Sequence, residues 1–248
     1  MTPHDPTVAL FDAVTCRHLD ALGVGAGWRC WDVGGGGPSI PAWMAGRVGP
    51  LGRVLATGID VDWSTGREAF EVRSHDVVRD ETPPETFDLV HARILLARVS
   101  DRHVALRNMV RALPPGGLLL VEELDIDFQP CATPDASGPA HYLSNRIRAG
   151  LLAELAQRGV DFELGRKLPR LLRQAGLVDV RAEGHLALAD PAAAAFEAMY
   201  IELCRDALVT MRAASHEELD RHLDAACRGR IDVAAPPLIS AWGRLPAG

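Results

Sequence analysis

The sequence has 248 residues, 48% of them hydrophobic and 24% charged, which is typical of a folded globular protein with a substantial core. Its formal net charge is −7 and its basic residues are scattered, which argues against nucleic-acid binding and favours a small-molecule partner. The N-terminus lacks a signal-peptide pattern and no run of about 18 apolar residues occurs, so we expect a cytoplasmic protein without a membrane span.

In the first half of the chain, predicted strands and helices alternate. Apolar residues recur at helical spacing over 8–22, 39–47 and 101–113. Short apolar runs predict strands over 28–33, 53–59, 70–74, 86–91 and 118–122, the last following a sharp turn at 114–117. This alternation is typical of a parallel sheet that is covered by helices on both faces.

The second half has a different pattern. A loop rich in Pro, Ser, Thr and Gly spans 130–138. Helices are predicted over 140–158, 168–175, 192–211 and 217–227, and strands over 177–188 and 237–244. The five cysteines show no CxxC spacing, so neither a disulfide framework nor a metal site is predicted. Three carboxylates, Glu122, Glu123 and Asp125, gather after the fifth strand without a second matching pair.

The glycine run Gly34–Gly37 follows the strand that ends in Asp32-Val33 and precedes a helix. Glycines let the backbone approach a ligand closely, and the helix N-terminus beyond offers free N–H groups. A glycine run also occurs in plain turns, so this pattern is weak when it stands alone. Its strand–loop–helix context favours a nucleotide-type cofactor site.

Two aspartates extend this pattern. Asp60 ends the second strand, where a carboxylate can accept hydrogen bonds from both hydroxyls of a ribose. Asp76 follows the third strand, where it can accept from the amino group of an adenine. Either residue alone is as well explained by a turn or a strand end, but both stand downstream of the glycine run.

Four segments now stand in order: GRVLATGID at 52–60, HD at 75–76, FDLVHAR at 87–93 and ALPPGG at 112–117. This series resembles the class I S-adenosylmethionine (SAM)-dependent methyltransferases, most closely the small-molecule enzymes of bacterial secondary metabolism, including antibiotic biosynthesis. The resemblance covers roughly 11–123, and more faintly 241–244. Each motif is weak alone, whereas four in this order are fairly specific.

The resemblance implies the fold. It is an α/β, Rossmann-like, doubly wound sheet of seven strands in the order 3-2-1-4-5-7-6, with strand 7 antiparallel and formed by 237–244. We expect a single domain over 1–248. It would comprise an N-terminal helix at 1–26, a SAM-binding core at 27–129, and helical insertions at 130–175 and 190–230 that cover the substrate.

The resemblance also implies the cofactor, SAM, and its product S-adenosylhomocysteine. The residues that match the cofactor-binding positions of the family are Asp32, Gly34, Gly35, Gly36, Asp60, Val61, Asp76, Val77, His91 and Ala92. Two positions depart from the family pattern. Pro38 replaces a glycine, and Arg98 stands where related enzymes often carry a histidine.

The expected reaction is methyl transfer to an O, N or C atom of a small, apolar or aromatic metabolite. A general base is needed only if the acceptor must lose a proton. The candidate bases are His91 and His141, although pocket lining or core packing explains His91 better, and an exposed position on a helix explains His141 better. The helices at 140–158 and 192–211 are expected to form the acceptor pocket.

Two other functions stay open at this point. Pro38 and Arg98 leave room for a protein with the SAM fold that does not transfer methyl groups, such as a cyclase or a pathway accessory. An NAD-binding oxidoreductase shares the glycine loop, but Ser39 stands where its third glycine belongs. A homodimer is open as an alternative to a monomer.

Overall fold

The computed structural model describes residues 5–135 and 137–247, and its centre is a seven-stranded sheet in the order β3-β2-β1-β4-β5-β7-β6. The strands are β1 (Arg29–Val33), β2 (Arg53–Gly58), β3 (Glu71–Ser74), β4 (Leu89–Arg93), β5 (Leu118–Leu124), β6 (Val178–His185) and β7 (Leu238–Arg244). β7 pairs antiparallel with both β5 and β6, and the other pairs are parallel. The predicted strand order and the antiparallel strand 7 are confirmed.

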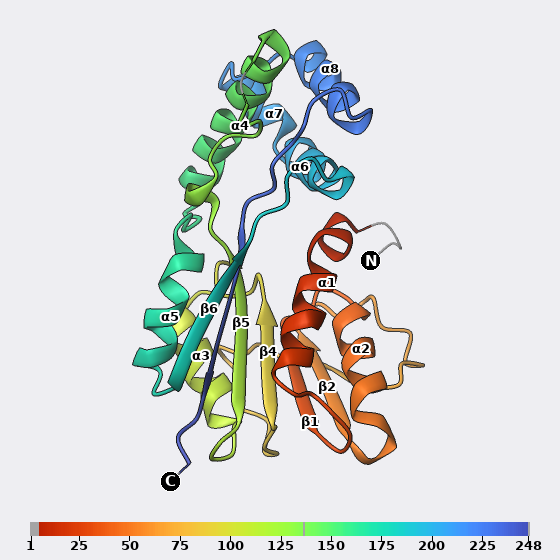
Figure 1. The fold of residues 1–248 in the computed structure, drawn as a ribbon, viewed down its shortest axis with the longest axis vertical. Helices are drawn as coiled ribbons and strands as arrows, with labels where there is room; N and C mark the ends of the chain where they lie inside the picture. The colour runs from red at the N-terminus through yellow and green to blue at the C-terminus, as the bar shows by residue number, and fades with distance from the viewer. Residues whose placement is uncertain (1–4, 136, 248) are drawn as a thin grey trace.

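Helices cover both faces of this sheet (Figure 1). Its buried strands carry apolar side chains on both sides, which the helices cover. On one face, α1 (Pro6–Ala21) and α2 (Ser39–Val48) pack a cluster that includes Leu19, Met44 and Leu120. On the other face, α3 (Arg102–Arg111) and α5 (Leu164–Gln174) pack a larger cluster that includes Trp31 and Leu119. The sheet core is therefore closed, and its strand ends are left to form a site.

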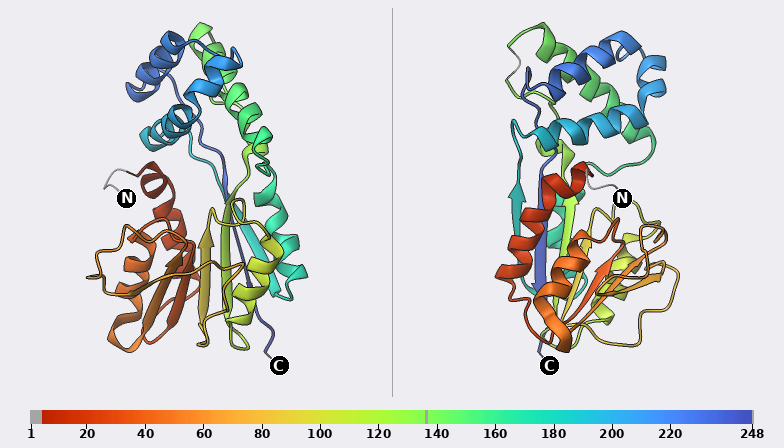
Figure 2. Two further views of the ribbon diagram at one scale, coloured as in Figure 1. Left: turned by 180° about the vertical axis from the view of Figure 1, so that it is seen from behind. Right: turned by 90° about the vertical axis from the view of Figure 1, so that its right-hand side faces the viewer.

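The remaining helices form a separate layer, which we call the helical cap. It comprises α4 (Pro139–Gln157), α6 (Pro191–Leu203), α7 (Arg205–Thr210) and α8 (His216–Cys227), held together by a cluster that includes Ile147, Ile201 and Leu208. Figures 1 and 2 show the cap lying beyond the carboxyl ends of the parallel strands. An edge-to-face contact between Phe11 and Phe196, with ring centroids 5.8 Å apart, joins α1 to α6 of the cap.

Several predicted boundaries differ from the observed ones. β4 spans Leu89–Arg93 rather than 86–91. At Asp88 the Arg29 amide of the neighbouring strand donates to the side-chain carboxylate, so regular strand pairing begins only at Leu89. α5 begins at Leu164, four residues early, although Pro169 lies inside it, where proline usually interrupts a helix. β6 ends at His185 rather than at residue 188, and Leu188 forms only an isolated bridge with Ala234.

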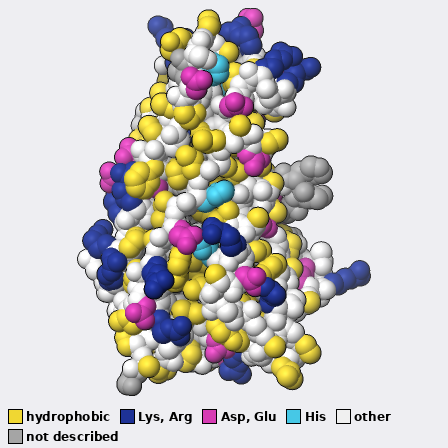
Figure 3. All heavy atoms as spheres, viewed as in Figure 1, with side chains coloured by type: hydrophobic (Ala, Val, Ile, Leu, Met, Phe, Trp, Pro, Cys, Tyr) yellow, Lys and Arg dark blue, Asp and Glu magenta, His cyan; other side chains and the backbone are white. Residues whose placement is uncertain are grey.

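The predicted helix over 192–211 is two helices, because the backbone leaves helical geometry at Cys204. Two short 3-10 turns, Gly49–Leu51 and Ile126–Phe128, complete the elements. Across the described residues, every helix is too short or too polar to cross a lipid bilayer. On the face shown in Figure 3, acidic and basic side chains are interspersed with hydrophobic ones.

Candidate active site

The glycine loop turns between β1 and α2 in a geometry that requires glycine. Gly34 has φ of 72°, in the left-handed region, and a Cβ atom there would collide with the Leu95 side chain. A Cβ atom on Gly35 would lie 2.6 Å from the Asp32 carboxylate. The Gly34 and Gly35 amides both donate to the Thr57 carbonyl, so these two groups fasten the loop to β2 rather than face a ligand.

The loop forms one wall of a cavity of about 760 Å³ at the carboxyl ends of β1, β2 and β4. Six predicted cofactor residues line this cavity: Gly34, Gly35, Gly36, Asp60, Asp76 and Val77. Asp60 lies two residues past the end of β2, exposed to solvent, and one of its oxygens also accepts from the Asp62 amide. Asp76 similarly accepts from the Val78 amide. The carboxylates are thus held in turns at the cavity wall.

Two aromatic side chains in this cavity offer polar atoms to a heteroaromatic ligand. The Trp63 indole N–H is enclosed and has no hydrogen-bond partner among the described residues. The His75 Nε2 atom lies 3.0 Å from the Glu81 carbonyl, which can only accept, so Nε2 carries the proton and the enclosed Nδ1 atom is left as an acceptor. A donor and an acceptor beside two carboxylates fit an adenosine, so the residues present suit SAM.

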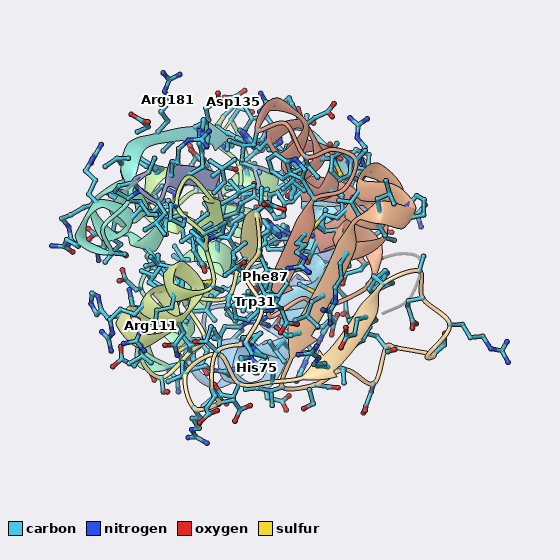
Figure 4. All side chains as sticks on the ribbon, turned by 90° about the horizontal axis from the view of Figure 1, so that it is seen from below. Trp31, His75, Phe87, Arg111, Asp135 and Arg181 are labelled. Atoms are coloured by element: carbon cyan, nitrogen blue, oxygen red, sulfur yellow. The ribbon has the colours of Figure 1, made fainter. Side chains whose placement is uncertain are left out.

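His75 is held in place by an aromatic stack. Its ring meets Trp31 edge-on at 5.8 Å, and Trp31 meets Phe87 at 5.6 Å. Figure 4 shows these three side chains grouped together. The Trp31 indole N–H donates to the Thr57 hydroxyl at 2.9 Å, which fixes the stack to β2. The cavity wall is therefore supported from the core.

A second cavity of about 310 Å³ extends from the glycine loop toward α6. The predicted residues Asp32 and His91 line it, together with Gly35 and Gly36. Of the other predicted cofactor residues, Val61 and Ala92 line neither of these two cavities; Ala92 is fully buried in the sheet core. The predicted stretch at the end of β4 thus contributes His91 but not Ala92.

His91 lies at the centre of a buried network of charged groups. Its Nδ1 atom is 2.6 Å from the Asp32 carboxylate and its Nε2 atom is 3.3 Å from that of Glu122. Glu122 also accepts from the hydroxyls of Thr15, at 2.5 Å, and Ser240, at 2.6 Å. Both nitrogens of the imidazole therefore face carboxylates, and the ring joins β1, β4 and β5.

The electrostatics of this network favour a charged imidazole. Burial by itself lowers the pKa of His91, but the hydrogen bonds that the ring donates to the Asp32 and Glu122 carboxylates outweigh it and raise this pKa to about 9. Burial also disfavours the charged form of Glu122 and by itself would raise its pKa. The hydrogen bonds that Glu122 accepts from His91, Ser240 and Thr15 instead hold this pKa below the ordinary value. At neutral pH His91 is a cation between two anions, with both nitrogens protonated.

A third cavity, of about 210 Å³, lies between the sheet and the helical cap, and we call it the cap cavity. Its walls are mostly apolar and include Leu124, Leu151 and Phe196. Arg98 lines this cavity and both of the others, so the three meet at its side chain. Arg98 is exposed and makes no ion pair within the described part of the chain.

The backbone is strained where the cavities meet. Ile94, directly after β4, has φ of 51°, which a β-branched residue rarely adopts. Its amide donates to the Glu122 carbonyl at 2.8 Å, and its side chain lines both the second cavity and the cap cavity. Strain of this kind is concentrated at functional sites, which marks the Ile94–Arg98 segment as part of one.

Glu122 and Glu123 point to opposite faces of the sheet, because side chains alternate along a strand. Glu122 belongs to the His91 network, whereas Glu123 lines the cap cavity and is 1% exposed. Its carboxylate accepts from the Leu96 amide at 2.5 Å. Burial raises the pKa of Glu123 to about 7, although the amides of the 95–97 turn act in the opposite direction. The third member of the predicted carboxylate group, Asp125, is paired with Arg166 at 2.6 Å.

His141 lies near the start of α4 in the cap, half-buried, with Nδ1 3.4 Å from the Ser137 hydroxyl. It lines none of the three cavities described above. The structure therefore does not bring the two candidate bases together. Its neighbour Tyr142 is exposed, in agreement with the surface alternative for this turn of the helix.

The structure adds site residues that were not predicted, chiefly Trp63, His75, Arg98 as a cavity residue, and Glu123. His75 stands next to Asp76, so its neighbourhood was visible in the sequence. Trp63 follows Asp60 after a turn, and a tryptophan in a polar loop is a signal that points to a ligand. Glu123 carries no sequence signal beyond its charge in an apolar strand, which predicts a partner or a function.

The fold and the cavity define a class I SAM-dependent methyltransferase domain, as the motif order predicts. The chain belongs to the methyltransferase domain family, whose model matches residues 10–182. The family match, together with Ser39 in place of a third glycine, leaves the NAD-binding oxidoreductase without support.

Individual proteins show the same likeness. The ubiquinone/menaquinone biosynthesis C-methyltransferase of Idiomarina loihiensis is 33% identical over 115 residues, which are 42% of this chain and 46% of that protein. The chain thus spans about half the length of the curated relatives it matches.

Two solved structures share the fold at low identity. Phosphoethanolamine N-methyltransferase 2 of Haemonchus contortus, in complex with phosphomonomethylethanolamine and S-adenosylhomocysteine, has a TM-score of 0.57 at 14% identity, covering 95% of this chain and 53% of that one. The [4+2]-cyclase SpnF has a TM-score of 0.52 at 16% identity, covering 95% and 83%.

Proposed function

We propose that this protein binds SAM in the 760 Å³ cavity and transfers its methyl group to a small acceptor in the cap cavity. The observation that carries the proposal is the convergence of the glycine loop, Asp60 and Asp76 on one cavity within a chain of the methyltransferase domain family. When bound, SAM supplies an electrophilic methyl group. The protein's own task is then to bind, orient and exclude water.

Residues around the cavity have separate roles in this proposal. Asp60 accepts hydrogen bonds from the ribose, and Asp76 and His75 accept from the adenine. The Trp63 N–H offers a donor to the ring. Gly34 and Gly36 let the backbone pass under the methionine part. Pro38 stands before α2 with its carbonyl accepting from the Ala42 amide, so the departure from the family pattern leaves the helix start intact.

We infer that His91 positions Asp32 and the glycine loop rather than acting as a base. Both of its nitrogens face carboxylates, so no lone pair is available to take a proton from an acceptor. His141 lies outside the three cavities and has no part in the proposed reaction.

The helical cap chooses the acceptor in this proposal. Of the two segments predicted to cover the substrate, 130–175 contributes α4 and 190–230 contributes α6, α7 and α8, whereas α5, at the end of the first segment, packs against the sheet. The apolar walls of the cap cavity support a small apolar or aromatic acceptor. The curated relatives act in ubiquinone and menaquinone biosynthesis, which favours a ring compound of this kind over an antibiotic precursor. The cytoplasmic location and the homodimer remain predictions.

The proposal is tested first by calorimetry with SAM and S-adenosylhomocysteine. We expect binding to the wild type and at least about ten-fold weaker binding to Asp60→Asn, because the ribose loses a charged acceptor. Asp206→Asn on α7 is the control, since this carboxylate is outside the cavities. Failure of the wild type to bind either ligand at millimolar concentration would refute the proposal.

The likeness to SpnF keeps a function without methyl transfer as the second candidate. Incubation with SAM labelled in its methyl group, together with a panel of phenols, quinols and amines, separates the two. Labelled product establishes transfer. SAM binding without labelled product from any acceptor class favours the cyclase or accessory alternative.

A further inference from the structure

The cap cavity contains a buried carboxylate that the roles proposed above leave without a function. Glu123 lines this cavity beside Leu124 and Ile126, and its side chain has no ion-pair partner within the described residues. The Leu96 amide donates a hydrogen bond to the Glu123 carboxylate at 2.5 Å, which joins Glu123 to the turn that follows Ile94. A buried carboxylate without an ion-pair partner is costly even when backbone amides hold it, which makes Glu123 a candidate functional group.

Glu123 lies near the place where the cap cavity meets the second cavity. Ile94 and Arg98, which line the cap cavity with it, also line the second cavity beside His91 and the glycine loop. The Glu123 carboxylate is therefore near the passage between the proposed cofactor site and the cap. Arg98 brings a positive charge to the same passage, where a negative charge on an acceptor would be stabilised.

We propose that the cap cavity binds a phenolic or enolic acceptor and that the Glu123 carboxylate takes the proton of its hydroxyl as the acceptor is methylated. This inference rests on the proposed methyltransferase function. The O–H bond breaks and its proton passes to Glu123. The electron pair left on the acceptor forms the bond to the methyl carbon, and the electrons of the broken carbon–sulfur bond stay on sulfur.

The cavity favours this class of acceptor for two reasons. Its volume of about 210 Å³ is below the roughly 300–1,000 Å³ of sites for drug-sized ligands, which suits a molecule of one or two rings. A carboxylate base removes a proton efficiently only from an acidic group, such as a phenol or enol, rather than from an aliphatic alcohol. Arg98 would then face the oxygen as it gains negative charge.

Glu123 is the group in this cavity whose charge is expected to change near neutral pH. The other charged or titratable side chains along its walls are Arg98, Arg148, Asp161, Glu197 and Tyr200. Burial opposes ionisation of Glu197 and Asp161, but their ion pairs hold both pKa values below the ordinary range. Burial raises the pKa of Tyr200 above its ordinary value. On the adjacent helix α5, Arg166 and Lys167 are paired with Asp125 and Asp161.

The test uses the binding of 2-naphthol, measured by calorimetry with and without S-adenosylhomocysteine at pH 5.5 and pH 8. A phenolic hydroxyl keeps its proton over this range. We expect the wild type to bind 2-naphthol at least about ten-fold more tightly at pH 8 than at pH 5.5, because the ionised carboxylate accepts a stronger, charge-assisted hydrogen bond than the protonated acid does. Naphthalene, which lacks the hydroxyl, should bind without this pH dependence.

Three variants make the result specific. Glu123→Gln keeps the shape of the side chain and an acceptor for the Leu96 amide, and should abolish the pH dependence. Glu123→Asp should retain part of it. Glu183→Gln, which removes an exposed carboxylate on β6, should behave as the wild type. Unchanged S-adenosylhomocysteine affinity in Glu123→Gln shows that the variant is folded.

Either of two results would overturn the inference: no binding of 2-naphthol to the wild type at either pH, or the same pH dependence in Glu123→Gln. These results are separate from the fate of the proposed function. If the wild type fails to bind S-adenosylhomocysteine, the proposed function fails, while the measurement with 2-naphthol alone still decides whether Glu123 recognises a phenol. An increase in methyl transfer to phenols between pH 5.5 and 8 that Glu123→Gln lacks would extend the binding result to the reaction.

Discussion

At the scale of single residues, His91 shows how the meaning of a histidine depends on its neighbours. A histidine at the end of a central strand, near a cofactor loop, is a reasonable candidate base by its position alone. Its two carboxylate partners come from β1 and β5, 59 and 31 residues away in the chain. Those partners turn a group that accepts protons into one that holds its proton up to about pH 9.

Replacing His91 by leucine should lower the free energy of unfolding by about 3–5 kcal/mol, because Asp32 and Glu122 would stay buried without the charge between them. The measurement is urea unfolding at pH 6.5. The double variant His91→Leu with Glu122→Gln should recover part of the loss.

The pH dependence gives a second check on His91. Its folded pKa, about 9, lies above the ordinary 6.5, so its stabilising contribution is complete below pH 6.5 and is lost as the pH rises through 9. The stability difference between wild type and His91→Leu should therefore shrink at pH 10. A difference that is constant with pH would mean that packing, rather than charge, is responsible.

At the scale of elements, the strand–loop–helix unit depends on Gly34 for two reasons: its backbone is in the left-handed region, and a Cβ atom there would collide with Leu95. Gly34→Ala should cost more than the roughly 1–2 kcal/mol of placing alanine in the left-handed region, since Leu95 must also move. Gly116→Ala is a matched control, because Gly116 has φ of 83° with nothing within 4 Å of the missing Cβ. Urea unfolding of both variants and calorimetry with SAM would check this. Equal losses in the two variants would rule out a role for Leu95.

The elements also show what local sequence determines. Strand order follows from the motif series, because each motif contains or adjoins one strand, β2, β3, β4 and β5 in turn, in a family with fixed topology. The start of β4 was misplaced because Phe87-Asp88 has the apolar-polar alternation of a strand, while Asp88 is in fact engaged by the Arg29 amide from β1. The break at Cys204 was invisible, because residues 192–211 have strong helix formers throughout and tertiary packing in the cap decides the bend.

The site was predictable to a similar extent. Gly34, Asp60 and Asp76 follow local motifs, so the sequence places them in the cavity. Glu123 and Arg98 depend on how the cap sits over the sheet, and a single sequence does not specify that packing. Their place in the site therefore follows from the tertiary packing and not from local sequence.

At the scale of the whole molecule, the buried carboxylates Glu122 and Glu123, on opposite faces of the sheet, change the free energy of unfolding with pH in opposite directions. Glu122, whose pKa is lowered, contributes stability that is present above its ordinary pKa and lost on acidification. Glu123, whose pKa is raised to about 7 from 4.5, makes the folded state less stable as the pH rises through that interval. Their sum favours a stability maximum on the acid side of neutrality.

Glu123→Gln should remove the loss of stability between pH 5 and pH 7.5, which for the wild type amounts to about 3 kcal/mol at 1.4 kcal/mol per pKa unit. Urea unfolding at intervals of half a pH unit measures it. Glu183→Gln serves again as the control and should keep the wild-type slope. An unchanged slope in Glu123→Gln would assign the effect to other groups.

The alternation of Glu122 and Glu123 along β5 has a consequence for how this domain tolerates insertions and deletions. Gaining or losing one residue within β5 would exchange the two carboxylates between faces, placing one charge against the wrong helices and removing another from His91. The turn at Pro114–Gly117, which lies before the strand, can change length without this exchange. Length variation among related chains should therefore collect at that turn and spare the end of β5.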